Sequence, residues 1–412
     1  MVRGGLPPGE ARAQDLTLDE AYRIALERNH DLMAAEEDVE QGRLLKRQAI
    51  TVLFPNLTAT AGYSRMEFDD GSETEGNSWG LSLNQTLYNG GRVWVAKRGA
   101  DYTLAAAQMG LEYVKQSILM DLVVHSNQLL SAEDILLVSG KRVERVREQV
   151  RRAEARLEVG DVPRTAVLAA SVTLSRAEME QVEARKAVSI AQTRLAALIG
   201  SDSPVRVLIP RDPDVPKEAA FEDLLQRAID GRADLAQARE LIRISEQEAE
   251  LVARSDNPNV DITGSYTRFS EENSFVPERQ IGVTLTWPFF QGGLVGLQTK
   301  EARSRVRQVQ QMYLSRVDNA RLQVEEAWLT LNALRVQEKM VRSNLTNALE
   351  NHRLAKAQFE LGAAVILDVL DAEEDLAEAE YLEVSHKYET RTALAALLYS
   401  IGALDIAAFG TD

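Results

Sequence analysis

Two aspartates, Asp368 and Asp371, have the type and spacing most suggestive of chemistry in this chain of 412 residues. They stand three residues apart in a segment of helical period, so their carboxylates would share one face of a helix. A pair of this kind can attract cations. Taken alone, however, two aspartates on a helix usually belong to a solvated surface.

The sequence carries no catalytic constellation. Its histidines are scattered without the spacing of metal ligands, and no phosphate-binding loop or nucleophile motif accompanies them. One of them, His352, matches Val150 in the helical pattern, which favours a packed histidine over a metal ligand. We therefore expect a protein that is not an enzyme and has no metal site and no cofactor. The four histidines are His30, His125, His352 and His386.

Composition narrows the class of protein further. The formal net charge of −16 argues against binding to nucleic acid, which needs a basic surface. The absence of cysteine excludes disulfides and zinc–thiolate sites. No segment approaches the roughly 18 consecutive apolar residues of a membrane-spanning helix. If the chain crosses a membrane, it must do so with strands.

The chain is internally duplicated. Pro55–Arg65 returns as Pro258–Arg268, 203 residues later, and Leu87–Gly91 returns as Phe289–Gly293, 202 residues later. A unit of this length is far longer than the roughly 20–50 residues of a solenoid repeat. Each copy must therefore be one half of the architecture, built twice.

The two halves define the expected domains. Ala11–Ala13 has the small-x-small form of a signal-peptidase site, so the first residues are either a disordered tail or a signal-peptide remnant. The expected division is a tail at 1–15; a first repeat at 16–200, with a β-hairpin at about 57–89 and a coiled-coil hairpin at about 92–199; a linker at 201–220; a second repeat at 221–402, with a β-hairpin at about 260–290 and a coiled-coil hairpin at about 294–401; and a tail at 403–412.

Each half contains two segments with the two-residue period of strands. At about 9–11 residues, such strands are long enough to cross a bilayer when tilted. Four strands cannot close a barrel, and an open sheet edge is forbidden in lipid, so several chains must complete it. The alternation predicts that one apolar face contacts lipid. It consists of Trp79, Leu81, Leu83, Leu87, Ile281, Val283, Leu285, Trp287 and Phe289.

Most of the remaining sequence has helical period. From Arg92 to Leu157 no proline interrupts it, and about 65 residues of helix would extend about 100 Å. Apolar residues three and four apart predict an antiparallel coiled-coil hairpin that reverses at Gly160–Pro163. The expected fold class is mainly α with a small β portion.

These features together resemble the TolC-like outer-membrane efflux proteins over Leu16–Gly402. The resemblance rests on the duplicated order of elements, on Tyr88–Gly91 and Phe290–Gly293 at the strand ends, and on Gly362 leading to Leu367–Ala372. It implies a homotrimer whose long coiled coils form an α-barrel through the periplasm. It also implies a β-barrel in the Gram-negative outer membrane, completed by trimerisation with four strands from each chain.

The resemblance further implies a function and a gate. The channel would export small molecules or proteins, as in multidrug export and type I secretion, together with a periplasmic adaptor and an inner-membrane transporter. The alternative is a soluble coiled-coil scaffold or a periplasmic adaptor. The family places aspartates such as Asp368 and Asp371 at the periplasmic constriction, where a trimer would gather them into rings that favour cations. Their counterparts in the first half are Ala166 and Ala169.

The tips of the two coiled-coil hairpins form the second expected site. The resemblance implies that they contact the adaptor, with Arg164 on the rim. Ala364 stands where family members often carry a basic residue that ties the gate shut, and Phe359 replaces a frequent tyrosine. Packing and other contacts would then have to hold the closed state. The predicted tip residues are Val159, Gly160, Asp161, Val162, Arg164, Leu361, Gly362, Ala363 and Ala364.

Overall fold

The computed structural model describes residues 14–67, 69, 73–201, 203–209, 220–271 and 274–409. Most of the predicted N-terminal tail, most of the predicted linker and the last three residues lie outside this part of the chain. The described part is mainly helical with a small antiparallel sheet, which confirms the predicted fold class.

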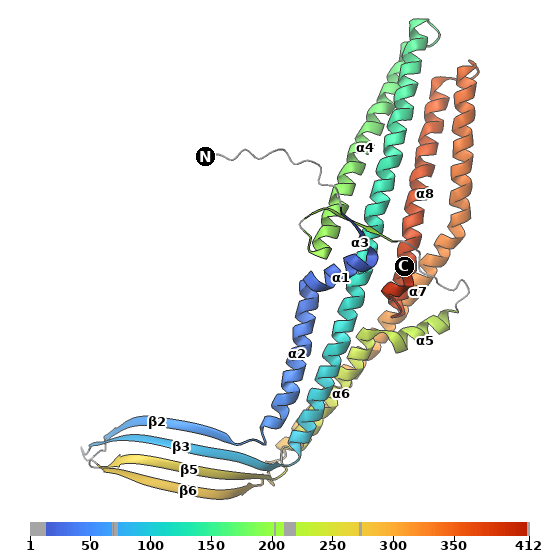
Figure 1. Ribbon diagram of the computed structural model, residues 1–412. Helices are drawn as coiled ribbons and strands as arrows, with labels where there is room; N and C mark the ends of the chain where they lie inside the picture. The colour runs from blue at the N-terminus through green and yellow to red at the C-terminus, as the bar shows by residue number, and fades with distance from the viewer. Residues whose placement is uncertain are drawn as a thin grey trace, which may run out of the picture. The chain divides into compact units, whose positions relative to one another are not determined.

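The elements follow the same order in both halves (Figure 1). The longest helices match closely: α3 and α7 have 67 residues each, and α4 and α8 have 36 and 35. The duplicated architecture is thereby confirmed. The elements of the first half are β1 (Gln14–Thr17), α1 (Leu18–Arg28), α2 (His30–Thr51), β2 (Asn56–Glu67), β3 (Glu73–Asn89), α3 (Arg92–Glu158) and α4 (Arg164–Ile199). Those that follow are β4 (Val205–Leu208), α5 (Phe221–Gly231), α6 (Ala233–Ala253), β5 (Asn259–Glu271), β6 (Ser274–Thr286), α7 (Leu294–Glu360), α8 (Ile366–Ser400) and η1 (Ile406–Phe409).

The chain forms two compact units. The first unit comprises Met1–Met33, Tyr113–Arg232 and Asp318–Asp412, and the second comprises Ala34–Glu112 and Ala233–Val317. Both α3 and α7 contribute a segment to each unit.

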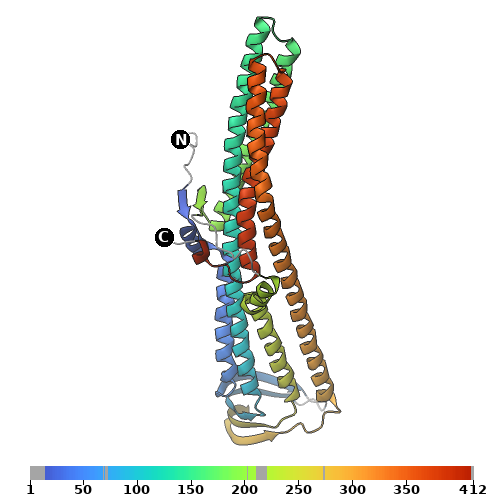
Figure 2. The ribbon, with the colours of Figure 1, turned by 90° about the vertical axis from the view of Figure 1, so that its right-hand side faces the viewer.

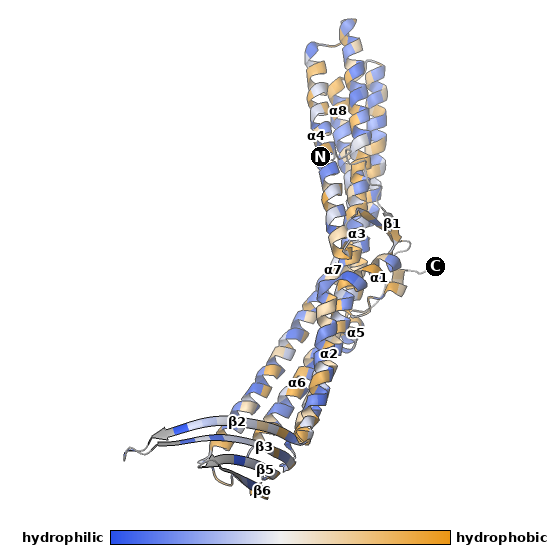
Figure 3. Cartoon of the chain, turned by 60° about the vertical axis from the view of Figure 1, so that its left-hand side comes forward, coloured by the Kyte–Doolittle hydropathy of each residue, from blue (hydrophilic) through white to orange (hydrophobic). Residues whose placement is uncertain are grey.

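The first unit holds the two coiled-coil hairpins, α3 with α4 and α7 with α8 (Figure 2). Hydrophobic and hydrophilic residues are interspersed along these helices, as heptad packing requires (Figure 3). Alanines recur at the buried positions of α4, which lets neighbouring helices approach closely. The helix begins directly after Pro163 and is terminated by Gly200, which adopts a left-handed φ of 71°.

The first unit also contains a two-stranded parallel sheet, which was not predicted. β1 pairs with β4 in a register that places Leu16 opposite Val207, and both side chains are buried. They pack against Leu122, Leu195 and Phe409 in the largest hydrophobic cluster. Part of the predicted linker is therefore a strand that attaches the start of the chain to the core.

The second unit holds α2, α6, the first parts of α3 and α7, and the four-stranded sheet. Charged pairs join its helices at the surface, such as Arg98 with Glu250 at 3.1 Å and Lys46 with Asp101 at 2.9 Å. The strand order is β2-β3-β5-β6, and all three pairings are antiparallel. β2 and β6 are thus the free edges of this sheet.

One face of the sheet carries the predicted apolar residues. Leu81 lies opposite Tyr266, and Ile281 opposite Gly264, so the alternation continues from strand to strand. Among the described apolar side chains of these four strands, none is buried within the chain, and Ile281 is 89% exposed. The described part of the chain therefore supplies no second layer for this face.

Two details differ from the sequence prediction. A bulge between Thr86 and Tyr88 interrupts the alternation at Leu87. Trp287 and Phe289 lie beyond the end of β6, with their rings 6.2 Å apart. The regular two-residue period thus ends before the last predicted lipid-facing residues.

Candidate functional site

The first two turns of α8 place the two aspartates on its exposed side. The backbone N–H of Val365 donates to Oδ2 of Asp368 at 3.0 Å, so this carboxylate also caps the helix. Val365 cannot return the bond, because valine has no side-chain acceptor. Asp371 lies one turn further along, also exposed, while Val369 and Leu370 face the buried cluster.

The same exposed face continues with Asp375 and Glu378, at the i+7 and i+10 positions from Asp368. The first-half counterparts are in a different environment. Ala166 is buried and Ala169 packs against the same hydrophobic cluster. The duplicated positions thus carry a charged exposed face in α8 and a small packed face in α4.

Each hairpin tip closes with the same backbone hydrogen bonds. The N–H of Asp161 donates to the carbonyl of Arg156 at 2.9 Å, and the N–H of Ala363 donates to that of Gln358 at 2.8 Å. Gly160 and Gly362 adopt φ of 78° and 75°, which a side chain would disfavour. The backbone requirement alone explains both glycines. Val159 and Leu361 project outward at the tips and are 79% and 85% exposed.

A groove of about 510 Å³ lies between the two tips. Phe359, one of the two departures from the family pattern, is only 2% exposed. The guanidinium of Arg156 stacks over its ring, 4.2 Å from the centroid, and donates to the carbonyl of Glu360 at 3.1 Å. The phenylalanine thus joins the tips by packing and a cation–π contact, without a hydroxyl.

A network of ion pairs connects the two hairpins behind the tips. Its members are Arg142 and Arg145 on α3, Glu180 on α4, His352 on α7, and Glu373, Glu374 and Glu380 on α8; we call these residues the inter-hairpin network. Arg142 is 2% exposed and donates to Glu180 and Glu374, both at 2.6 Å. The network therefore links α3 to both α4 and α8.

Glu373 is the most deeply buried charge in this network, at 0% exposure. Nε of Arg145 lies 2.8 Å from its Oε1, and Nη2 of Arg145 lies 2.8 Å from Oε2 of Glu380. Burial alone would lower the pKa of Arg145, but the bonds to Glu380 and Glu373 outweigh it and raise the pKa above its usual value. The guanidinium is therefore held in its charged form.

His352 occupies the packed position predicted for it. Its Nε2 lies 3.0 Å from Oε2 of Glu373, close enough for an ion pair when the imidazole is protonated, although the two atoms are not aligned as a hydrogen bond. Groups of three or more potential metal ligands do not occur among the residues that the structure describes.

Sequence reasoning missed the inter-hairpin network. Arg142 and Arg145 lie beside the apolar heptad positions Val143 and Val146 of α3, where charged residues are ordinary in a coiled coil, so the local pattern carries no signal of the network. The partners on α8 lie more than 200 residues away in the chain, and no local period connects them.

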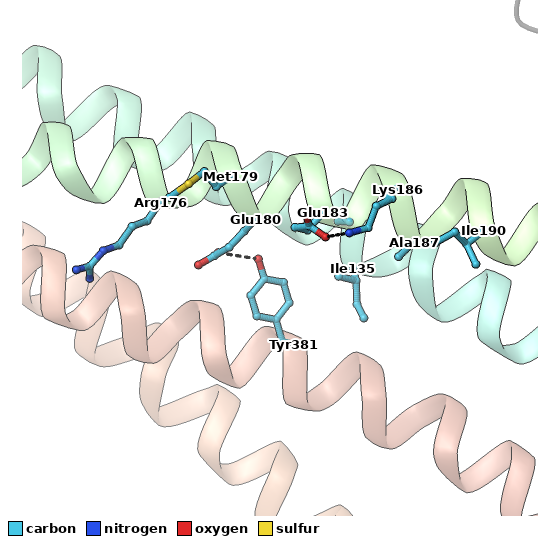
Figure 4. Close-up of a pocket in the computed structure, with 10 residues that line it drawn as sticks. Ile135, Arg176, Met179, Glu180, Glu183, Lys186, Ala187, Ile190 and Tyr381 are labelled. Carbon is cyan, nitrogen blue, oxygen red and sulfur yellow. Dashed lines mark hydrogen bonds and ion pairs between the residues drawn. The ribbon is translucent and has the colours of Figure 1, made fainter.

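A shallow groove of about 620 Å³ lies between α4 and α8, with Ile135 of α3 also lining it (Figure 4). Met179 and Ile190 are exposed there, and the hydroxyl of Tyr381 donates to Glu180 at 3.5 Å. Burial, together with the negative charge of Glu180, raises the pKa of Tyr381 and keeps it neutral. α4 thus presents apolar residues that its own chain leaves uncovered. The exposed apolar residues of this stripe are Leu168, Val172, Met179, Val182 and Ile190.

A matching stripe runs along α7. Leu322, Leu329 and Val336 are exposed and follow one another at intervals of seven residues. This is the spacing of a coiled-coil seam. The stripes on α4 and α7 and the edge strands β2 and β6 are thus left uncovered by the described part of the chain.

The paired hairpins, the doubled order of elements and the open four-stranded sheet define the class of outer-membrane channel proteins. CusC, solved in a study of transmembrane channel formation, superposes with a TM-score of 0.82 at 18% identity, covering 96% of this chain and 95% of that one. The MtrE outer-membrane channel of Neisseria gonorrhoeae gives a TM-score of 0.78 at 21% identity, covering 98% and 94%. At these identities the likeness establishes the fold.

The model of the family described as "Outer membrane efflux protein" matches residues 21–201 and again 224–403, so the chain belongs to this family. Among its relatives are the TolC outer membrane protein of Vibrio cholerae, 24% identical over 94% of this chain and 91% of that protein, and the alkaline protease secretion protein AprF of Pseudomonas aeruginosa, 23% identical over 95% and 85%. The predicted outer-membrane location and export function are confirmed. Within the described residues, no helix is long and apolar enough to span a membrane.

Proposed function

We propose that three copies of this chain form one export conduit through the outer membrane and the periplasm, without catalytic activity of their own. The observation that supports it best is the open four-stranded sheet. Its edge strands β2 and β6 are unpaired on one side, and its apolar face is exposed in the described part of the chain. In lipid such edges must be paired, and three chains contribute twelve strands when the β6 edge of one meets the β2 edge of the next.

The helical stripes support the same assembly. The exposed apolar residues of α4 in one copy would be covered by those of α7 in the next, continuing the ring around the periplasmic tube. A head-to-tail contact of this kind closes into a ring, whereas a two-fold contact would leave free edges. The alternative, a soluble coiled-coil scaffold or adaptor without barrel strands, does not account for a sheet whose apolar face is exposed, as it is in β2, β3, β5 and β6.

A test of this assembly is the migration of the detergent-purified protein on a denaturing gel with and without heating. We expect an unheated band at the mass of three chains that converts to one chain, of 45.7 kDa, on boiling. A protein that stays in solution without detergent and migrates as a single chain would contradict the proposal.

The conduit would receive its cargo through a periplasmic adaptor, energised by an inner-membrane transporter. Two relatives support this partnership by their names: the alkaline protease secretion protein AprF and the pyoverdine export outer membrane protein OpmQ of Pseudomonas aeruginosa. We assign adaptor contact to the hairpin tips, whose exposed apolar residues and intervening groove offer a docking surface. Small molecules and proteins both remain candidate cargo for the conduit.

Reversing the charge of Arg164 should weaken adaptor docking. Arg164 is exposed at the first position of α4, where a glutamate would favour the helix dipole, so Arg164→Glu should not weaken the helix itself. We expect the variant to raise drug susceptibility in a pump-dependent assay, while Arg164→Lys retains resistance. Full resistance in Arg164→Glu, at an equal level of outer-membrane protein, would exclude Arg164 from the contact.

A further inference from the structure

The hairpin end of the sheet carries a cluster of aromatic and arginine side chains on the apolar face. Trp79 lies opposite Arg268, and Tyr266 lies opposite Arg279, in the strand register. Directly opposed residues share a face, so all four lie on the side that also carries Leu81, the partner of Tyr266. We call Trp79, Tyr266, Arg268 and Arg279 the outer belt.

Contacts within the outer belt are aromatic and cationic. The rings of Trp79 and Tyr266 lie 5.6 Å apart. The guanidinium of Arg268 is 6.0 Å from the centroid of Trp79, and that of Arg279 is 5.7 Å from the centroid of Tyr266. These contacts orient the two arginines and leave their guanidinium hydrogens able to donate to a further group.

Neither arginine of the outer belt forms an ion pair with any residue that the structure describes. Arg65, near the same end of the sheet, differs because its Nη1 lies 3.2 Å from Oε1 of Glu75. Arg268 and Arg279 are diagonal neighbours on adjacent strands, about 7–8 Å apart at the backbone. One tetrahedral anion could therefore receive hydrogen bonds from both guanidinium groups.

The position of the outer belt along the strands indicates which anion it meets. The eight residue steps from Trp79 to Leu87 span about 26 Å, close to the height of about 25 Å of an apolar band in a membrane barrel. The belt stands at the hairpin end of this band, and Trp287 and Phe289 stand at the helix end. With the helices in the periplasm, the belt lies at the level of the outer leaflet.

We propose that Arg268 and Arg279 bind the phosphate groups of the glycolipid that forms the outer leaflet. This inference rests on the proposed placement of the sheet in the membrane. Guanidinium groups match phosphate oxygens in bidentate geometry, and aromatic rings favour the same interfacial depth. The belt thus anchors the channel by charge as well as by apolar area.

Native mass spectrometry of the full-length protein in nanodiscs tests the assignment, with lipid A as the probe. We expect Arg268→Gln/Arg279→Gln to retain lipid A at least about tenfold less tightly than the unaltered protein. The matched control is Arg65→Gln, because Arg65 already has Glu75 as a partner and should change retention little. Dephosphorylated lipid A should bind both proteins equally weakly, and free phosphate should not compete at millimolar concentration.

Equal retention by the double variant, an equal loss in Arg65→Gln, or binding that ignores the phosphates would each overturn the proposal. A separate measurement monitors membrane placement. The chain has no cysteine, so a fluorophore on Leu81→Cys reports one position, and brominated lipid should quench it. Absence of quenching would overturn the membrane placement together with the lipid site, whereas quenching without phosphate dependence overturns the lipid site alone.

Discussion

Removing the charges of Asp368 and Asp371 together should abolish block of the channel by multivalent cations. Both carboxylates are exposed on one face of α8, beside the tip of the second hairpin. In the proposed trimer they would form two rings of three negative charges, and such rings attract cations most strongly where the passage is narrow and poorly screened. We expect the blocking affinity to fall at least about tenfold in single-channel recordings.

The choice of variant separates charge from helix capping. Asp368→Asn/Asp371→Asn removes the charges but keeps an acceptor for the N–H of Val365, whereas the alanine variant removes both. Both should lose the block to the same extent if charge is responsible. Glu378→Ala is the matched control, since it removes a carboxylate from the same face further from the tip. An unchanged block in both double variants would refute the gate assignment.

Truncating Arg145 should destabilise the protein strongly. Arg145→Ala leaves Glu373, at 0% exposure, without the guanidinium that neutralises it, and an unpaired buried charge costs about 3–5 kcal/mol. The guanidinium chloride concentration that half-unfolds the protein in detergent should therefore be clearly lower for this variant. The ion pairs of Arg145 join α3 to α8, so their loss should let the two hairpins separate more easily. We therefore also expect longer open periods in single-channel recordings.

Two further variants test the origin of this effect. Arg353→Ala breaks an exposed pair with Glu350 one turn away on α7, which should change the unfolding midpoint little because solvent screens the pair. Arg145→Ala/Glu373→Leu removes the buried charge together with its partner and should recover much of the lost stability. If Arg145→Ala is no more destabilised than Arg353→Ala, the network does not hold the hairpins together.

Local periodicity predicted much of this fold because most of its elements are long and regular. The repeated Pro55 and Pro258 segments located the strands, and the unbroken run after Arg92 located α3. Asp368 was singled out by its mismatch with Ala166, and the structure places the two in different environments. Its role as a gate residue remains a prediction.

The missed features depend on contacts between distant segments. The pairing of β1 with β4 joins residues nearly 200 positions apart. A strand of four residues is also too short to show a recognisable two-residue alternation. Arg142 and Arg145 lie beside the apolar heptad positions of α3, where charged residues are ordinary, and only their partners on α8 explain how the charges are compensated. The bulge at Leu87 depends on the register with β5, which the sequence of β3 alone does not contain.

Electron cryomicroscopy of the full-length protein in lipid nanodiscs is the most direct test of the proposed three-chain conduit. We expect three copies around one axis, with β6 of each chain paired to β2 of the next and the α4 and α7 stripes in contact between copies. The rings of Asp368 and Asp371 should line the narrowest part of the helical tube. A monomer, or an assembly that leaves the edges of β2 and β6 unpaired in the lipid, would contradict it.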